Sequence, residues 1–315
     1  MSAPGVVEVR SPGLLTTVQD LGRYEFGPLG VSPSGAADPI ALRLGNRLVG
    51  NEANTAALEM TLLGGTFSFP QGAIVALGGS DFGATLDGAP VPMWTTIAVQ
   101  AGQTLQTGPT RSGARCYLSI RGGIATDPFL GSRSTHLLSG LGGVEGRALR
   151  RGDVLQIGPA SGSFRAKSLS KYAMEQLSPR RVLRVTPGPQ TKWFSDEAKR
   201  AFYANSYRVA EDSNRMGLRL EGTALPGRAP GEMITEGVSL GAIQITAAGL
   251  PIILFVEQQT TGGYAKIANV ISADISSLGQ LRPRDEIRFE LVDWETARNL
   301  LLELEKLLVS EGLLV

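Results

Sequence analysis

The chain has 315 residues, of which 42% are hydrophobic, and 30 basic against 29 acidic residues give a formal net charge of +1. This balance, without a long run of one sign, argues against a nucleic-acid or membrane-surface role. The single cysteine, Cys116, and the single histidine, His136, exclude a disulfide framework and a zinc site built from cysteines or several histidines.

The remaining polar residues must therefore supply any chemistry. Cys116 alternates with other apolar residues and His136 has no alternating carboxylate beside it, so both are predicted to be structural. The N-terminus lacks a basic-then-apolar signal, and the apolar runs are too short to span a bilayer, so we expect a cytoplasmic protein. Chemistry would then depend on carboxylates, Arg, Lys, Gln, Thr, Tyr and backbone amides.

Short apolar runs separated by glycine and proline predict a strand-rich fold in both halves of the chain. Strands in the N-terminal half are expected over 6–10, 14–18 and 116–120, with a further series between 57 and 106. Strands in the C-terminal half are expected over 182–185, 218–220, 242–246, 252–256 and 264–271.

Three helices interrupt this pattern. Residues 39–49 follow a capping carboxylate at Asp38 and a proline at the first helical position. Residues 195–203 begin with acidic side chains that favour a helix N-terminus. From residue 293 the leucines recur at three- and four-residue spacings, which predicts an amphipathic C-terminal helix. Its polar face is not basic, so a docking or packing role is favoured over membrane binding.

A composition change suggests two lobes. Residues 161–180 are rich in serine and lysine and are predicted to form a linker. This linker would separate an N-terminal lobe, residues 1–160, from a C-terminal lobe with the final helix, residues 181–315.

The most informative stretch is PIILFVEQQTTGGY at 251–264. An apolar run over 252–256 predicts a strand covered on both faces. Five polar residues follow, and then Gly262 and Gly263, which are expected to turn with positive φ and to let a ligand come close. Each unpaired buried polar group costs about 1–3 kcal/mol. These side chains therefore need protein partners, water or a ligand, and a polar hairpin loop is the simpler alternative.

Several phrases along the chain resemble one family, and they extend over roughly residues 6 to 290. The family is that of biotin-dependent carboxyltransferases, allophanate hydrolase subunit 2 and KipA proteins. The phrases are VQDLGR at 18–23, SGAADPIA at 34–41, ALEMTLLGG at 57–65, YLSIRGG at 117–123, LGSRST at 130–135, NRMGLRL at 214–220 and QTTGGY at 259–264.

The resemblance implies a mainly β fold with two cyclophilin-like β-barrel lobes in tandem. It also implies a partner of the KipI or allophanate hydrolase subunit 1 type. Stand-alone chains of this size are most similar to a subunit of bacterial ATP-dependent 5-oxoprolinase, which opens the 5-oxoproline lactam to L-glutamate. Such an enzyme implies a third subunit and ATP, bound by the complex if not by this chain.

Two other roles stay open under the same resemblance. A carboxyltransferase subunit of a urea carboxylase or allophanate hydrolase system would need a biotin carrier. A KipA-like regulator would instead sequester a kinase-inhibitor protein without catalysis.

The resemblance and the residue chemistry together predict one pocket in the C-terminal lobe. Arg215 is expected to contact an anion, Glu257 to act as base or orienting group, and Lys266 to serve as an ion partner of Glu257. The expected substrate-binding residues are Gln244, Gln259, Thr260, Gly262, Gly263 and Tyr264. The alternatives are a purely structural pairing of Glu257 with Arg215 or Lys266, and simple core packing of Tyr264.

The N-terminal half offers a second group of candidates. Arg23, Asn46 and Arg133 lie in family phrases and are expected in a second pocket or in pairing between the lobes. Asp38 is expected to act only as a helix cap. No metal site is predicted.

Overall fold

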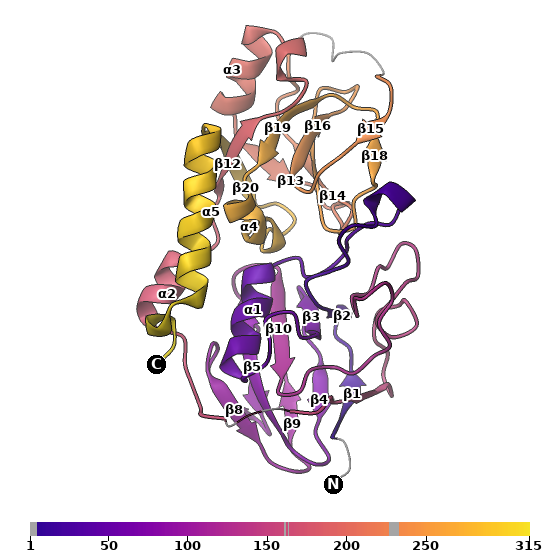
Figure 1. Cartoon of the computed structure of the whole chain (residues 1–315), viewed down its shortest axis with the longest axis vertical. Helices are drawn as coiled ribbons and strands as arrows, with labels where there is room; N and C mark the ends of the chain where they lie inside the picture. Colours follow the sequence, from indigo (N-terminus) through magenta and orange to yellow (C-terminus); the bar gives the residue numbers. More distant parts are fainter. Residues whose placement is uncertain (1–4, 161, 163, 227–232) are drawn as a thin grey trace. The chain divides into compact units, whose positions relative to one another are not determined.

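The computed structural model describes residues 5–160, 162, 164–226 and 233–315 (Figure 1). They divide into two compact units. The first unit comprises the described residues up to Arg23, Ser34–Leu177 and Leu308–Val315, and the second comprises Tyr24–Pro33 and the described part of Ser178–Leu307.

These boundaries differ from the expected ones in three places. The segment predicted as a linker enters the first unit through Leu177, because Ser168 N donates to Val315 O at 2.7 Å and Leu169 bridges Leu314. The C-terminal residues belong to the first unit for the same reason. The short N-terminal segment Tyr24–Pro33 belongs to the second unit.

The first unit is built on two antiparallel sheets. The six-stranded sheet has the order β11-β1-β4-β9-β6-β7, and the five-stranded sheet has the order β2-β3-β10-β5-β8. Buried residues of both sheets, among them Val9, Phe67, Leu77 and Leu118, form one hydrophobic core. The strands are β1 (Val6–Ser11), β2 (Leu15–Gln19), β3 (Ala57–Thr61), β4 (Thr66–Ser68), β5 (Ala73–Gly79), β6 (Thr85–Leu86), β7 (Ala89–Pro90), β8 (Thr96–Val99), β9 (Thr104–Gln106), β10 (Arg115–Ile120) and β11 (Val154–Gln156).

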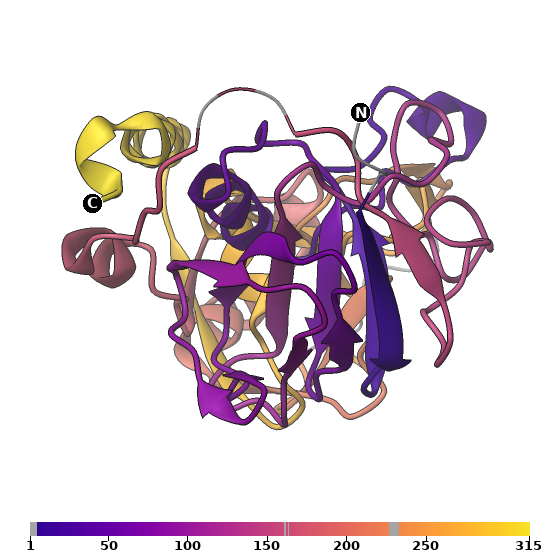
Figure 2. The same ribbon diagram turned by 90° about the horizontal axis from the view of Figure 1, so that it is seen from below.

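The helix α1 (Pro39–Leu48) covers β5 and β10 of the five-stranded sheet (Figure 2). It begins as the sequence predicts, with Asp38 Oδ1 accepting from Ala41 N at 2.9 Å. Its apolar face is buried because Leu42 packs with Tyr117 and Leu48 packs with Ala76. This unit also contains α2 (Lys171–Gln176) and the 3-10 turn η4 (Glu311–Leu313).

A buried polar network fixes the start of α1 to the sheet. Tyr117 Oη donates to Glu59 Oε2 at 2.6 Å and accepts from Asp38 N at 2.8 Å. Ala37 N donates to the same Glu59 oxygen at 2.8 Å, and Arg115 lies 3.7 Å from the other one. Burial and the neighbouring carboxylate of Glu59 raise the pKa of Tyr117 well above its ordinary value. Three of the family phrases therefore meet in one structural network.

The second unit is a closed seven-stranded barrel with the order β12-β19-β16-β17-β14-β13-β20. All its pairs are antiparallel except β12 with β20, which closes the barrel in parallel register. A separate two-stranded sheet pairs β15 with β18. The strands are β12 (Val182–Pro187), β13 (Tyr207–Val209), β14 (Gly217–Glu221), β15 (Glu236–Gly237), β16 (Ala242–Ile245), β17 (Pro251–Leu254), β18 (Thr261–Gly262), β19 (Lys266–Val270) and β20 (Glu286–Leu291).

Helices complete the second unit. The helix α3 (Asp196–Ala204) is capped by Ser195, and its Phe202 stacks on Phe289 of β20 with ring centroids 4.6 Å apart. The predicted C-terminal helix is present as α5 (Trp294–Val309), and its last two residues belong to the first unit. Of its residues only Leu308 is buried. The remaining helical elements are α4 (Ile275–Gly279) and the 3-10 turns η1 (Gly27–Leu29), η2 (Thr191–Trp193) and η3 (Ser272–Asp274).

The prediction of a mainly β fold with two β lobes and an amphipathic C-terminal helix is confirmed. Among the described helices, none has the length and apolar content that crossing a bilayer requires.

Candidate functional site

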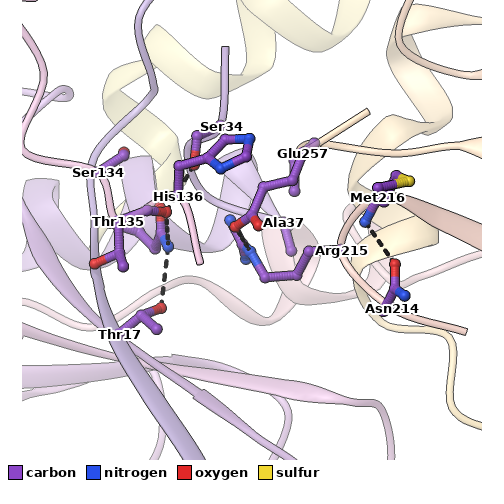
Figure 3. Close-up of polar contacts among 12 residues, drawn as sticks. Thr17, Ser34, Ala37, Ser134, Thr135, His136, Asn214, Arg215, Met216 and Glu257 are labelled. Carbon is purple, nitrogen blue, oxygen red and sulfur yellow. Dashed lines mark hydrogen bonds and ion pairs between the residues drawn. The ribbon is translucent and has the colours of Figure 1, made fainter. Parts of the chain in front are cut away.

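The pairing of β14 with β17 brings Arg215 and Glu257 together in the second unit. These antiparallel strands place Gly217 opposite Leu254. Arg215 precedes β14 and Glu257 follows β17, and the pairing continues past both strands because Glu257 N donates to Arg215 O at 2.8 Å. Arg215 Nε then donates to Glu257 Oε1 (Figure 3). In the segment before β14, the neighbouring Asn214 Oδ1 accepts from Met216 N at 2.8 Å, which fixes the backbone around Arg215.

This ion pair is almost fully buried, with 5% of the Arg215 side chain and 3% of the Glu257 side chain exposed. Two charges removed from water are stable only when they remain paired and hydrogen-bonded. The strand before Glu257 is shorter than predicted, because β17 ends at Leu254 and the chain then turns. Ser32 Oγ, from the Tyr24–Pro33 segment of the same unit, donates to Val256 O of this turn at 3.2 Å.

Lys266 was expected to pair with Glu257, and the structure contradicts this. Its Nζ lies 2.7 Å from Glu236 Oε1 instead. The reason is the strand order, since β16 lies between β17, which leads to Glu257, and β19, which begins at Lys266. The residue of β16 opposite Lys266 is Gln244.

Glu236 and Gln190 complete a polar group around this lysine. Gln190 Nε2 donates to Glu236 Oε1 at 2.9 Å, and Gln190 Oε1 accepts from Lys266 N at 3.1 Å. The hydrogen bonds from Lys266 and Gln190 lower the pKa of Glu236, which therefore stays a carboxylate at neutral pH. We call Gln190, Glu236, Gln244 and Lys266 the Lys266 cluster.

For Gly262 and Gly263, the predicted positive φ is wrong, but the predicted close approach is present at Gly262. Neither Gly262 nor Gly263 has a positive φ, because Gly262 lies in β18, opposite Glu236 of β15. A Cβ at Gly262 would nevertheless lie 2.5 Å from Gln244 Nε2, so this position needs glycine for close approach. Among the described residues, Gln244 Nε2 has no hydrogen-bond partner although Gln244 is only 1% exposed.

Three other predicted substrate-binding residues, Gln259, Thr260 and Tyr264, are more accessible, and we call them the rim. Gln259 is exposed, and its Nε2 lies 3.3 Å from the position of a Cβ on Gly262. Thr260 is half-buried and its carbonyl accepts from Val238 N at 3.1 Å. Tyr264 is 45% exposed, which argues against simple core packing. The structure thus gathers Gln244, Gln259, Gly262 and Lys266 and leaves Arg215 with Glu257 as a separate pair.

Arg23, Asn46 and Arg133 lie in the first unit and brace loops there. Arg23 donates to Phe129 O at 3.3 Å and to Ser134 O, and it stacks over the Phe129 ring. Asn46 Nδ2 donates to Thr55 O at 2.7 Å, which ties the end of α1 to the following loop.

Arg133 acts through both its backbone and its side chain. Its N donates to Asp20 Oδ2 at 2.6 Å, and its Nε donates to Thr126 O at 2.9 Å. Asp20 also accepts from Ser132 Oγ at 2.6 Å and Ser134 Oγ at 2.5 Å, so it joins the VQDLGR and LGSRST phrases.

The two residues predicted to be structural are buried. Burial raises the pKa of the Cys116 thiol far above its ordinary value, which suppresses the thiolate. His136 is 4% exposed, and its Nδ1 accepts from Ser139 N at 3.1 Å. Within the described residues, His, Cys, Asp and Glu side chains form no cluster of three or more suited to a metal ion.

The family can now be assigned. A family model described as "Carboxyltransferase domain, subdomain A and B" matches residues 29–291, which is most of the chain. The chain belongs to the carboxyltransferase-domain family. This confirms the resemblance that the sequence phrases carry.

Relatives of this carboxyltransferase-domain chain fall into two groups. It is 38% identical to the C subunit of 5-oxoprolinase from Escherichia coli over 292 residues, 93% of each chain. The corresponding protein of Haemophilus influenzae is 37% identical over 90% of each chain. Urea amidolyase of Saccharomyces cerevisiae is 34% identical over 94% of this chain but only 17% of its own length.

Solved structures of carboxyltransferase-domain proteins show the same fold. Urea amidolyase of K. lactis superposes with a TM-score of 0.90 at 34% identity, over 98% of this chain and 20% of that one. The Kluyveromyces lactis urea carboxylase gives a TM-score of 0.91 at 34% identity, over 99% of this chain and 30% of that one.

Two members of the Lys266 cluster and one motif were not predicted from the sequence. Glu236 and Gln190 were not predicted, although a buried lysine on a strand signals that a carboxylate must lie nearby. The chain also contains a G-x-S-x-G pattern around Ser239. It leads into strand β16 rather than into a helix, and Ser239 Oγ donates to Asn269 Oδ1 at 2.8 Å, so it is no nucleophile elbow.

Proposed function

We propose that this chain is one of the subunits of an ATP-dependent 5-oxoprolinase, which opens the lactam of 5-oxoproline to L-glutamate. The observation that carries the proposal is the nearly end-to-end match with the C subunits of two 5-oxoprolinases. The urea amidolyase relative, in contrast, is several times longer than the matched segment. The match therefore extends over nearly the whole of each 5-oxoprolinase subunit but over only a small part of the urea amidolyase.

The reaction needs groups that hold an amide and steer a proton. Water adds to the lactam carbonyl carbon, the carbon–nitrogen bond breaks, and a proton from the water is transferred to the ring nitrogen. The developing negative charge on the carbonyl oxygen must be stabilised by a donor. The Lys266 cluster and its rim contain groups of both kinds.

We assign roles by accessibility and, for Gln244, by the missing hydrogen-bond partner of its Nε2. Glu236, whose side chain is 42% exposed, would accept a hydrogen bond from the substrate amide or from the attacking water. Gln244 Nε2, a buried donor without a partner beside Gly262, would donate to the carbonyl oxygen. Gln259, Thr260 and Tyr264 would contact the remaining polar groups of the substrate. Lys266 and Gln190 would position Glu236 rather than touch the substrate.

The Arg215–Glu257 pair has a positioning role in this proposal. Both side chains are at least 95% buried, and each is engaged by the other. Their contribution is to hold the turn between β17 and the polar run in place.

ATP fits this site poorly. The two cations that the sequence proposed for the pocket, Arg215 and Lys266, are each already engaged by a carboxylate. Gly262 and Gly263 lack the positive φ values that would point successive N–H groups at a phosphate. We therefore assign ATP binding to another subunit, and no step in this chain passes through ATP.

The implied partners are a KipI-like, allophanate hydrolase subunit 1-like protein and a third oxoprolinase subunit. The two 5-oxoprolinase relatives are named as subunits, and by that name each is part of a larger enzyme. Activity in this chain is accordingly expected only in the complex.

Reconstitution tests the proposal directly. The three purified subunits are mixed with 5-oxoproline and ATP, and glutamate is measured with each subunit omitted in turn. Glutamate release that requires all three subunits supports the proposal. Absence of release from the full mixture, with the subunits shown to co-purify, overturns it.

The solved urea carboxylase structure supports a second candidate, because its TM-score of 0.91 spans 99% of this chain. A carboxyltransferase role would require a biotinylated carrier protein and bicarbonate. Biotin-dependent transfer to urea in place of glutamate release would establish it. Tight binding to the KipI-like partner without either reaction would instead establish the regulatory role.

A further inference from the structure

We infer that the first unit carries a separate pocket for a flat, ring-containing small molecule with an amide edge, meaning an N–H donor beside a C=O acceptor. None of the residues in it belongs to the Lys266 cluster or its rim. The inference is independent of the proposed function, since it concerns the first unit alone.

The pocket lies beside the edge strands of both sheets of this unit. Strand β7 is the last strand of the six-stranded sheet, and β8 is the last strand of the five-stranded sheet. The connection between them, Val91 to Trp94, lines a cavity of about 540 Å³ together with Gly79, Ala84 and Thr85. Small-molecule sites typically have volumes of about 300–1,000 Å³, and the open ends of β structures are frequent locations for them.

We call this cavity at the edge strands β7 and β8 the edge pocket. Its inner wall is apolar and continuous with the hydrophobic core of the first unit. Ala84 is buried in the core cluster of the unit, and Val91 and Met93 pack against that cluster. Such a wall favours a ligand with an apolar body, because burying apolar surface is favourable in proportion to its area.

Trp94, one of the residues that line the cavity, has an unusual backbone conformation. Its φ is 59°, which is rare for a bulky side chain, and its N donates to Leu77 O at 2.8 Å. Its ring lies so close to Gly78 that a Cβ there would be 2.8 Å from Cζ3. Backbone strain of this kind persists where surrounding structure enforces it and is enriched at ligand sites. Trp94 also packs against the buried residues under α1, which holds it in place, and an aromatic residue fixed at the cavity favours a planar, π-bonded ligand.

The rim of the edge pocket is a preformed ion pair. Arg111 Nη1 lies 3.1 Å from Asp81 Oδ2, and Asp81 Oδ1 accepts from Gly83 N at 2.7 Å. Arg111 N also donates to Asp81 O at 2.8 Å, so the two residues are joined by backbone and side chain. Gly83 has a φ of 59°, a backbone conformation that favours glycine at this position.

This rim selects the polar group of the ligand. The Asp81 side chain is 42% exposed and that of Arg111 is 68% exposed, so both keep faces that a ligand can reach. Their charges cancel, and a carboxylate ligand would be repelled by Asp81 as much as it is attracted by Arg111. An amide edge satisfies both residues, with its N–H donating to Asp81 and its C=O accepting from Arg111.

Calorimetry with a defined probe tests the inference on the full chain. The probe is carbostyril, a fused benzene–pyridone lactam, and the matched compound is N-methylcarbostyril, which lacks the N–H donor. We expect carbostyril to bind at one site per chain and N-methylation to weaken binding about tenfold. Absence of carbostyril binding at millimolar concentration, or equal affinity for both compounds, overturns the inference.

Variants locate the binding. Arg111→Gln is expected to weaken carbostyril about tenfold, since it removes the charged donor. Ser112→Trp, at an exposed position of the pocket lining, is expected to abolish binding by filling the mouth. Arg10→Gln is the matched control, because Arg10 is 62% exposed and paired with Glu8 in the same unit. Unchanged affinity in Arg111→Gln, or a loss in Arg10→Gln of the same size, overturns the assignment.

Discussion

The second unit contains two acid–base pairs that differ in how far solvent reaches them. In the Arg215–Glu257 pair, 5% and 3% of the side chains are exposed. In the Lys266–Glu236 pair, the lysine is 3% exposed but the carboxylate is 42% exposed. One pair is closed on both sides, and the other presents its acidic partner to whatever enters.

This difference in exposure indicates which pair stabilises the fold and which pair can contact a substrate. A closed pair cannot exchange its partner for a substrate without leaving a charge unpaired in a poorly solvated site. An open pair can, because the exposed carboxylate keeps lone pairs that a substrate can reach. The Lys266 cluster is therefore the better candidate for substrate contact, and the Arg215–Glu257 pair is the better candidate for a scaffold.

The largest expected effect is on folding, from Arg215→Ala. The substitution leaves Glu257 buried without its main counter-charge, and removing one partner of a buried pair costs about 3–5 kcal/mol. Urea unfolding followed by circular dichroism should show the loss. The control is Arg219→Ala in β14. Arg219 forms an exposed pair with Asp212, and such a pair contributes about 0–1 kcal/mol. Equal shifts in the urea midpoint for the two variants would show that the buried pair is not a scaffold.

The second effect is on turnover, from Glu236→Gln. This variant keeps the shape of the side chain but removes the charge that orients substrate or water, so glutamate release by the complex should fall on the order of 100-fold. The control is Glu286→Gln, since Glu286 is 68% exposed and lies 3.9 Å from Arg208. The variant complex must still co-purify. Wild-type turnover in an assembled Glu236→Gln complex would remove the open pair from the chemistry.

The sequence predicted local features better than the partners of buried charges. The Asp38 cap follows from a pattern within a few residues, and the proximity of Arg215 to Glu257 was one of two pairings left open for the carboxylate. The partner of Lys266 depends on strand order, because β16 separates β19 from β17. Neither run length nor alternation reveals that order.

Glu236 was missed for a related reason. It sits in a two-residue strand, β15, whose pairing with β18 is too short to leave a periodic pattern. Gly262 illustrates the same limit, since its role depends on the side chain of Gln244 from another strand rather than on its own φ. The site is therefore set by register between distant segments.

A third test compares the two glycines of the β15–β18 sheet. A Cβ at Gly262 would lie 2.5 Å from Gln244 Nε2, so Gly262→Ala should destabilise the chain by about 1–3 kcal/mol through overpacking. Gly237→Ala is the control, because no atom lies within 4 Å of a Cβ there and its φ is not positive. Its effect should stay within about 0.5 kcal/mol. If both variants unfold at the same urea concentration, close packing does not explain the glycine.

The smallest expected effect is the pH dependence of the open pair. Lys266 and Gln190 lower the pKa of Glu236 below its ordinary value of 4.5, so the pair stabilises the folded chain above that pH. The stabilisation is lost as the pH falls through the lowered pKa, where Glu236 becomes neutral and resembles glutamine. The urea midpoints of wild type and Glu236→Gln should therefore differ at pH 7 and converge as the pH falls below 4.5. Glu286→Gln, which removes an exposed carboxylate with a more distant partner, should show little difference from wild type at any pH. A wild-type advantage over Glu236→Gln that is constant across this range would mean that the charge of Glu236 does not hold Lys266, and the distinction between the open and closed pairs would lose its electrostatic basis.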